Sequence, residues 1–202
     1  GNASAGPSAS FTATGGIVRI EDIRVIVLAD VLADGTLELN IGPRAPLRLA
    51  INTEDGDELF TVRHISGDPD SDDGETVSVT AFNITLEYEG VKRIRGVAGD
   101  GNDSVTIEDG VLAPVALWGD HIDPAVGNPG NDTLQVFGSG NAVLSGGFGN
   151  DTLRGGTGDD ELFGDAGDDY LFGSRGHDIL HGGAGSDVLV GDNGMVELSA
   201  TG

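Results

Sequence analysis

The chain has 202 residues, of which 34 are acidic and 10 basic, giving a formal net charge of −24. This balance excludes nucleic acids and anionic membrane surfaces as partners, because they require clustered Lys and Arg. There is no cysteine, which excludes disulfides, thiolate metal sites and cysteine nucleophiles. Only 38% of residues are hydrophobic and 5% aromatic, so we expect something besides apolar burial to stabilise the fold.

The first part of the chain is predicted to be β-rich. Residues 1–15 are small and polar, and we interpret them as a linker or cloning remnant. Residues 16–126 contain short apolar or alternating runs between Asp-Gly and Gly-Asp turns, with no amphipathic helix. The expected strands cover residues 17–20, 25–28, 37–41, 47–51, 59–62, 77–79, 84–88 and 105–107.

A nine-residue repeat dominates the rest of the chain, where 20 of the 35 glycines lie. Written from Phe137, it gives FGSGNAVLS, GGFGNDTLR, GGTGDDELF, GDAGDDYLF, GSRGHDILH and GGAGSDVLV. Position four is always glycine, position eight leucine, and position six aspartate except at Ala142. Nine residues fit a turn and a three-residue strand whose middle side chain faces inward. We therefore predict that residues 127–198 coil every eighteen residues, with 199–202 as a tail.

The sixth-position aspartates are expected to stack, because strands of successive coils lie ~4.8 Å apart. One column contains Asp151, Asp169 and Asp187, and the other contains Asp160 and Asp178. Like charges at this spacing repel by about 1 kcal/mol even in water, and a divalent cation between them reverses the penalty. Carboxylate and carbonyl oxygens in a flexible cage favour Ca²⁺ over zinc, copper or Mg²⁺. The sequence thus predicts calcium at the turns.

The units GGFGNDTLR and GGTGDDELF match the nonapeptide G-G-x-G-x-D-x-U-x almost completely. The chain therefore resembles the RTX, or hemolysin-type, family of calcium-binding repeat proteins. The resemblance implies an all-β fold with a right-handed parallel β-roll, a form of β-solenoid, that holds calcium between successive turns. The ligands it implies are the carboxylates of Asp132, Asp151, Asp160, Asp169, Asp178 and Asp187 and the main-chain oxygens of Gly147, Gly149, Gly156, Gly158, Gly167, Gly176, Gly183 and Gly185.

The pattern has departures inside the repeat and weaker copies before it. The departures are Ala142, Asp165 and Ser174 in place of the second glycine, and Val196 at the last sixth position. The copies are residues 127–135 (GNPGNDTLQ), 98–106 (AGDGNDSVT) and 55–60 (DGDELF). In the first of these, Asp132 lies nineteen residues before Asp151, one residue out of phase. The copies favour an irregular β-solenoid over a separate small β-domain for residues 16–126.

The expected function is calcium binding that drives folding and stiffening of a secreted protein, without catalysis. The four histidines form no H-E-x-x-H motif, and no G-x-S-x-G nucleophile motif accompanies them. The resemblance implies export through a type I secretion channel, as part of a larger bacterial polypeptide, to the extracellular space or the cell surface. The exposed final coil also allows end-to-end self-association of the roll.

Three alternatives remain open at this point. The chain could be an adhesin that binds a cell-surface glycan or protein, with the roll as its stalk. It could instead be the non-catalytic C-terminal part of a secreted enzyme. The third alternative is a module that cleaves itself at Asp68-Pro69 or Asp123-Pro124 when calcium binds, as the resemblance to RTX proteins allows.

Overall fold

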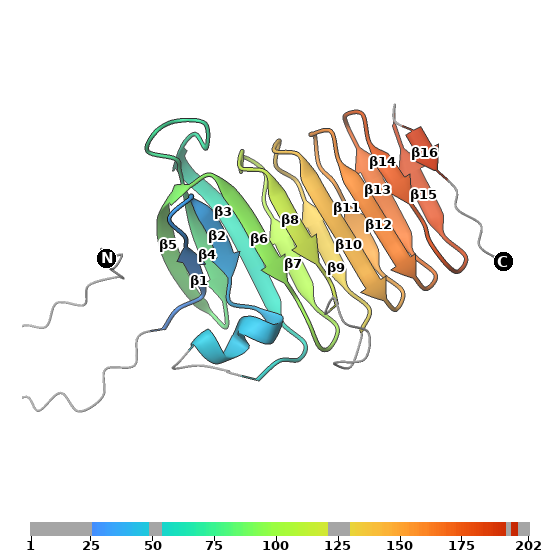
Figure 1. Ribbon diagram of the computed structural model, residues 1–202, viewed down its shortest axis with the longest axis horizontal. Helices are drawn as coiled ribbons and strands as arrows, with labels where there is room; N and C mark the ends of the chain where they lie inside the picture. Colours follow the sequence, from blue (N-terminus) through green and yellow to red (C-terminus); the bar gives the residue numbers. More distant parts are fainter. Residues whose placement is uncertain (1–25, 49–53, 121–129, 193–194, 198–202) are drawn as a thin grey trace, which may run out of the picture.

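The computed structural model describes residues 26–48, 54–120, 130–192 and 195–197, in which strands stack along one axis into two facing sheets (Figure 1). The first sheet contains, in spatial order, β1 (Ala29–Val31), β2 (Thr36–Leu39), β6 (Arg93–Val97), β8 (Val115–Trp118), β10 (Ala142–Phe148), β12 (Glu161–Ala166), β14 (Ile179–His181) and β16 (Met195–Glu197). The second contains β15 (Val188–Gly191), β13 (Tyr170–Ser174), β11 (Thr152–Arg154), β9 (Thr133–Val136), β7 (Ser104–Ile107), β3 (Leu59–Gly67), β4 (Glu75–Ala81) and β5 (Ile84–Val91).

Successive strands of the repeat pair in parallel, with the predicted eighteen-residue offset. The paired leucines form two rows, Leu144, Leu162 and Leu180 in one sheet and Leu153, Leu171 and Leu189 in the other. At the last coil the offset changes, because β16 pairs Val196 with Leu180 rather than continuing the nine-residue count. The prediction that Val196 occupies the sixth, aspartate-bearing position was therefore wrong: the strand register places it in the leucine row.

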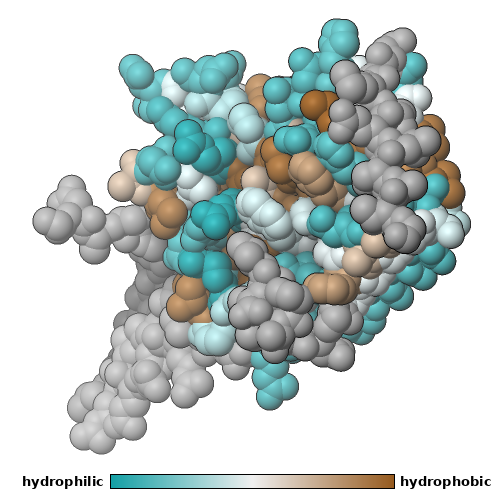
Figure 2. Space-filling view, turned by 45° about the vertical axis from the view of Figure 1, so that its right-hand side comes forward, coloured by the Kyte–Doolittle hydropathy of each residue, from teal (hydrophilic) through white to brown (hydrophobic). Residues whose placement is uncertain are grey.

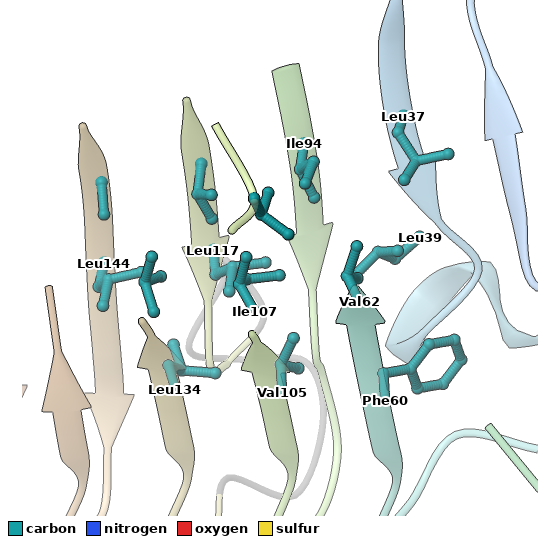
Figure 3. Close-up of a cluster of buried hydrophobic side chains, with 14 of the residues drawn as sticks. Leu37, Leu39, Phe60, Val62, Ile94, Val105, Ile107, Leu117, Leu134 and Leu144 are labelled. Atoms are coloured by element: carbon teal, nitrogen blue, oxygen red, sulfur yellow. The ribbon is translucent and has the colours of Figure 1, made fainter. Parts of the chain in front are cut away.

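The hydrophobic core is a single cluster that fills the space between the two sheets. Leu144, Leu153 and Leu162 are fully buried, as the inward-facing position predicts. Figure 3 shows that both rows of inward side chains continue upstream of the repeat, through Leu117 in one sheet and Leu134 in the other. Parallel pairing is also continuous, from β2 to β16 in one sheet and from β3 to β15 in the other. Residues on both sides of position 126 thus share one core.

The first part of the chain adds antiparallel strands to these sheets. β3, β4 and β5 form a meander, and β1 pairs antiparallel with β2 at the opposite sheet's edge. A 3₁₀ helix, η1 (Gly42–Arg48), follows β2. The expected strand at 47–51 was therefore wrong at its first two residues, because Pro43 and Pro46 have no N–H for a sheet ladder and fix φ near helical values.

The observed strands differ from the expected ones in other places as well. Residues 26–28 are not a strand, and β1 begins at Ala29. The strands β6 (RIRGV) and β8 (VALW) were not among the expected ones; each is short, and β8 lacks alternation of apolar and polar residues. The expected strand at 17–20 lies outside the described residues. In the described part of the chain, no helix is long and apolar enough to span a membrane.

The outer surface is mixed in polarity. On the side that includes the C-terminal end of the stack, hydrophobic side chains are exposed in separate places among hydrophilic ones (Figure 2). The exposed hydrophobic residues of the last coils are Tyr170, Ile179, Val188 and Val190. Alternation along each strand explains them, because side chains next to the inward leucine point outward.

Replacing Leu162 by alanine is expected to lower the free energy of unfolding by about 2–5 kcal/mol, because a fully buried leucine leaves a cavity. The control is Val143→Ala on the paired strand, where the side chain is 39% exposed and a loss of about 0.5 kcal/mol or less is expected. Urea unfolding in saturating calcium measures both. Equal losses for the two variants would contradict the inward placement of the leucines.

Candidate metal site

The sixth-position aspartates form hydrogen-bonded ladders along the two edges of the stack. At one edge, Asp151 N–H donates to Asp169 Oδ1 at 2.8 Å, and Asp169 N–H donates to Asp187 Oδ1 at 3.1 Å. At the other edge, Asp160 N–H donates to Asp178 Oδ1 at 3.2 Å. Each aspartate thus caps the turn of the preceding coil with one carboxylate oxygen, and the columns contain the residues expected from the eighteen-residue period.

The other carboxylate oxygen, Oδ2, is buried and accepts no hydrogen bond from the described residues. This holds for Asp151, Asp160, Asp169 and Asp178. All four side chains belong to residues that are at most 2% exposed. A buried carboxylate oxygen without a partner is costly, so each of these oxygens requires a proton or a cation.

The first glycine of each repeat forms the wall against which Oδ2 lies. A Cβ on this glycine would lie within 2.2–2.5 Å of Oδ2, so a side chain here would displace the carboxylate. The glycine–aspartate pairs are Gly146 with Asp151, Gly155 with Asp160, Gly164 with Asp169, Gly173 with Asp178, and Gly182 with Asp187. At Gly164 the same point is 2.4 Å from the main-chain oxygen of Gly182. A carboxylate oxygen and a carbonyl oxygen therefore face one position that only glycine leaves free.

The glycines expected as ligands on sequence grounds also shape the packing of the turns. At position four, a Cβ on Gly167 would lie 1.7 Å from the oxygen of Gly149, so successive coils touch there through their backbones. Gly176 and Gly185 stand in the same relation to the oxygens of Gly158 and Gly167. Position two has positive φ in every unit from Gly147 onward, namely Gly147, Gly156, Asp165, Ser174 and Gly183. Asp165 and Ser174 thus keep the turn that glycine makes elsewhere.

The first-position carbonyl oxygens are not among the ligands that the repeat pattern predicted. The structure places one of them, Gly182 O, beside an unpartnered Asp oxygen. The signal was present, because glycine occupies position one in five consecutive units. In the described part of the chain, no three acidic or histidine side chains converge as a metal site. Any ion at these turns therefore needs main-chain oxygens as well as carboxylates.

Burial dominates the electrostatics of the ladders. It raises the pKa of Asp151 to about 8, of Asp160 to about 7 and of Asp169 to about 6, and it also raises the pKa of Asp178. Backbone N–H donors oppose the shift, while neighbouring carboxylates add to it. The ionised carboxylates are thus destabilised in the fold, and a bound cation would remove much of this electrostatic cost.

Two segments, residues 138–171 and 163–194, match the family model of the RTX calcium-binding nonapeptide repeat (4 copies). The chain carries an RTX-type calcium-binding repeat. We call residues 138–194 the RTX segment. The repeat of this family binds Ca²⁺, so calcium is the ion for which the turns are built, as the resemblance predicted. No curated protein and no solved structure matches the chain significantly.

Asp132 lies just before the RTX segment and continues its first ladder. Its N–H donates to Asp151 Oδ1 at 2.7 Å, although the two residues are nineteen rather than eighteen positions apart. Asp103 N–H in turn donates to Asp132 Oδ1 at 2.8 Å, and Glu58 N–H donates to Asp103 Oδ1 at 2.8 Å. The ladder therefore extends over six coils, from Glu58 to Asp187.

Arg48 neutralises the first acid of this ladder. Its guanidinium forms an ion pair with Glu58, and both side chains are fully buried. Arg48 Nη2 also donates to Glu54 O at 2.8 Å, and the guanidinium lies 5.0 Å from the centre of the Phe82 ring. Burial still raises the pKa of Glu58 to about 7, against the opposing effects of Gly42 N–H and Arg48. A protein cation thus occupies the end of the ladder, and nothing in the repeat pattern could have predicted it.

Replacing Arg48 by methionine is expected to lower the free energy of unfolding by about 3–5 kcal/mol, because Glu58 is left as a buried, uncompensated acid. The matched control is Arg63→Met, which removes an ion pair to Glu108 from an arginine side chain that is 64% exposed and should cost about 1 kcal/mol or less. The double variant R48M/E58Q should recover part of the loss. Denaturant unfolding in calcium measures all three, and equal effects at both arginines would contradict the assignment.

Without calcium, acidification is expected to stabilise the fold. Burial raises the pKa of Asp151 to about 8, from 3.8 in the free side chain, so the folded state binds protons more tightly than the unfolded chain. This stabilisation is fully present below about pH 4 and is lost as the pH rises through about 8. Far-UV circular dichroism in excess chelator should show more β-structure at the acidic end of this window. A decrease in β-structure on acidification would refute the expectation.

Proposed function

We propose that the RTX segment binds calcium at its turns and that binding drives the folding and stiffening of the chain. The row of buried Oδ2 atoms without hydrogen-bond partners carries this proposal, since each faces the main chain of a glycine. Calcium accepts six to eight oxygen ligands in irregular geometry, which suits a mixture of carboxylates and carbonyls from successive coils. The match of this segment to a calcium-binding repeat supports the same ion.

The proposed carboxylate ligands are the residues of the two ladders that lie in or beside the RTX segment. They are Asp132, Asp151, Asp160, Asp169, Asp178 and Asp187, with main-chain oxygens of the turn glycines completing each shell. Without the ion, several like charges would be buried next to one another, which favours the unfolded chain. Because the sites exist only in the folded coil, the free energy of binding is also free energy of folding.

RTX repeats occur in secreted bacterial proteins, and we propose an extracellular or cell-surface location for this one. The repeat would then fold when the exported chain meets extracellular calcium, as a non-catalytic part of a larger polypeptide. Right-handed winding of the coils, which the family resemblance implies, belongs to the same proposal. The strongly acidic composition is consistent with a chain that stays unfolded until a cation binds.

The test is a calcium titration followed by far-UV circular dichroism, with Asp169→Asn beside the parent chain. We expect the variant to require more calcium for the same gain in β-structure, or to reach a smaller gain, because one buried ligand loses its charge. The matched control is Asp168→Asn, which removes the same charge from an exposed neighbour and keeps an oxygen for Ser186 N–H. A parent chain equally structured in chelator and in calcium would overturn the proposal.

A further inference from the structure

The turn geometry of the RTX segment continues upstream of the residues that match the family. A Cβ on Gly149 would lie 1.8 Å from Gly130 O, and one on Gly130 would lie 1.8 Å from Gly101 O. This is the coil-on-coil contact seen at position four inside the repeat. The ladder from Asp151 to Asp132 and Asp103 runs alongside it. Residues 119–120 and 130–132 therefore form a repeat turn, interrupted by the segment 121–129, which lies outside the described residues.

This upstream turn has the same oxygen arrangement as a turn of the RTX segment. A Cβ on Gly119 would lie 2.2 Å from Asp132 Oδ2 and 2.3 Å from the main-chain oxygen of Gly146. The corresponding distances at Gly164 are 2.5 Å to Asp169 Oδ2 and 2.4 Å to Gly182 O. Asp132 is 1% exposed, and its Oδ2 accepts no hydrogen bond from the described residues.

The upstream turn also contains a buried carboxylate in the second position, which downstream is glycine, Ser174 or the exposed Asp165. Asp120 follows Gly119, in the second position, where the next coil has Gly147. Its Oδ2 accepts a hydrogen bond from Phe148 N–H at 2.6 Å, while its Oδ1 is buried without a partner among the described residues. Asp120 as a whole is 7% exposed. Its charge is close enough to Asp132 to help raise the pKa of that carboxyl.

One coil further upstream the arrangement ends. Val97 pairs with Trp118, so the residue that stands opposite Gly119 is Ala98. Ala98 is buried and its Cβ takes the room that the first-position glycine leaves free. Asp103, the next acid of the ladder, also has a buried Oδ2 without a partner among the described residues, but Ala98 stands where its turn would need the first-position glycine. Glu58, the acid before it, is paired with Arg48. The geometry thus singles out one turn upstream of residue 138.

We propose that Asp120, Asp132 and the main-chain oxygen of Gly146 form a further calcium site, with both carboxylates upstream of the segment that matches the RTX family. The proposal rests on the proposed function, because the coil must fold for these oxygens to meet. Two carboxylates and a carbonyl oxygen are hard ligands that suit Ca²⁺. Asp120 supplies a second negative charge to one ion, which favours tighter binding here than at a turn with glycine in this position.

The location of the single tryptophan, Trp118, gives a local readout, since it lies two residues before Asp120. Tb³⁺ replaces Ca²⁺ at oxygen sites and emits when a nearby excited tryptophan transfers energy to it. The full chain would be titrated with Tb³⁺ and excited where tryptophan absorbs and tyrosine does not. We expect Asp120→Asn to lose most of the tryptophan-sensitised emission and to bind one Ca²⁺ fewer in equilibrium dialysis.

The matched control is Asp165→Asn, which lies in the same second position two coils downstream and has a positive φ that asparagine also tolerates. It should leave the emission unchanged. Trp118→Phe should abolish the emission without changing the number of bound Ca²⁺ ions. Circular dichroism in calcium would show that each variant folds.

The outcomes separate the two proposals. If Asp120→Asn and the parent give the same emission and bind the same number of Ca²⁺ ions, the upstream site is refuted while calcium-dependent folding stands. A parent chain that shows neither Tb³⁺ emission nor any response of its β-structure to calcium would refute the proposed function itself.

Discussion

The constraint on which the rest of this structure depends is a set of buried carboxylate oxygens that accept no hydrogen bond within the described part of the chain. Each sixth-position aspartate uses Oδ1 to cap the preceding coil and leaves Oδ2 against a bare glycine backbone. Glycine is therefore required at two positions of the turn. A side chain at position four would block the contact between coils, and one at position one would block the place beside Oδ2. The leucine core is apolar, so its side chains offer no hydrogen bond to these oxygens. Folding and the charge state of the turns are thus one equilibrium.

The parts of the fold that follow a local rule could be predicted from the sequence. The leucine rows, the eighteen-residue offset and the aspartate columns all follow from a nine-residue unit with a two-residue side-chain alternation. The rest depends on contacts between distant residues. Glu58 and Asp103 are neighbours in the ladder although the whole β3–β5 meander lies between them in the sequence. A fixed nine-residue period cannot reveal such an insertion. The pairing of Arg48 with Glu58 is likewise a tertiary contact, made by a 3₁₀ helix that proline imposes.

The two edges of the solenoid differ in a way that the repeat unit conceals. One edge has an acid at every sixth position from Glu58 to Asp187. At the other edge, Asp160 and Asp178 are preceded by Ala142 and Val115, both of which are buried apolar residues. Upstream of Asp160 that edge is therefore held by ordinary hydrophobic packing. Buried carboxylate oxygens without a partner among the described residues therefore lie mainly at one edge of the stack, and the other edge has them only from Asp160 onward.

The ion pair of Arg48 makes the N-terminal end of the acidic ladder different from its C-terminal end. Arg48 is a cation that belongs to the chain, so the coil it closes needs no ion from the medium. Further along that edge, each of four aspartates has a buried Oδ2 without a hydrogen-bond partner among the described residues: Asp103, Asp132, Asp151 and Asp169. The N-terminal coils can therefore serve as a folded template, because each of the two sheets presents a strand with which the next strand can pair. Ordering of the remaining coils can proceed from this template one turn at a time, each step adding a strand to each sheet. Under the proposed function, the calcium level of the surroundings sets how far along the chain this order extends.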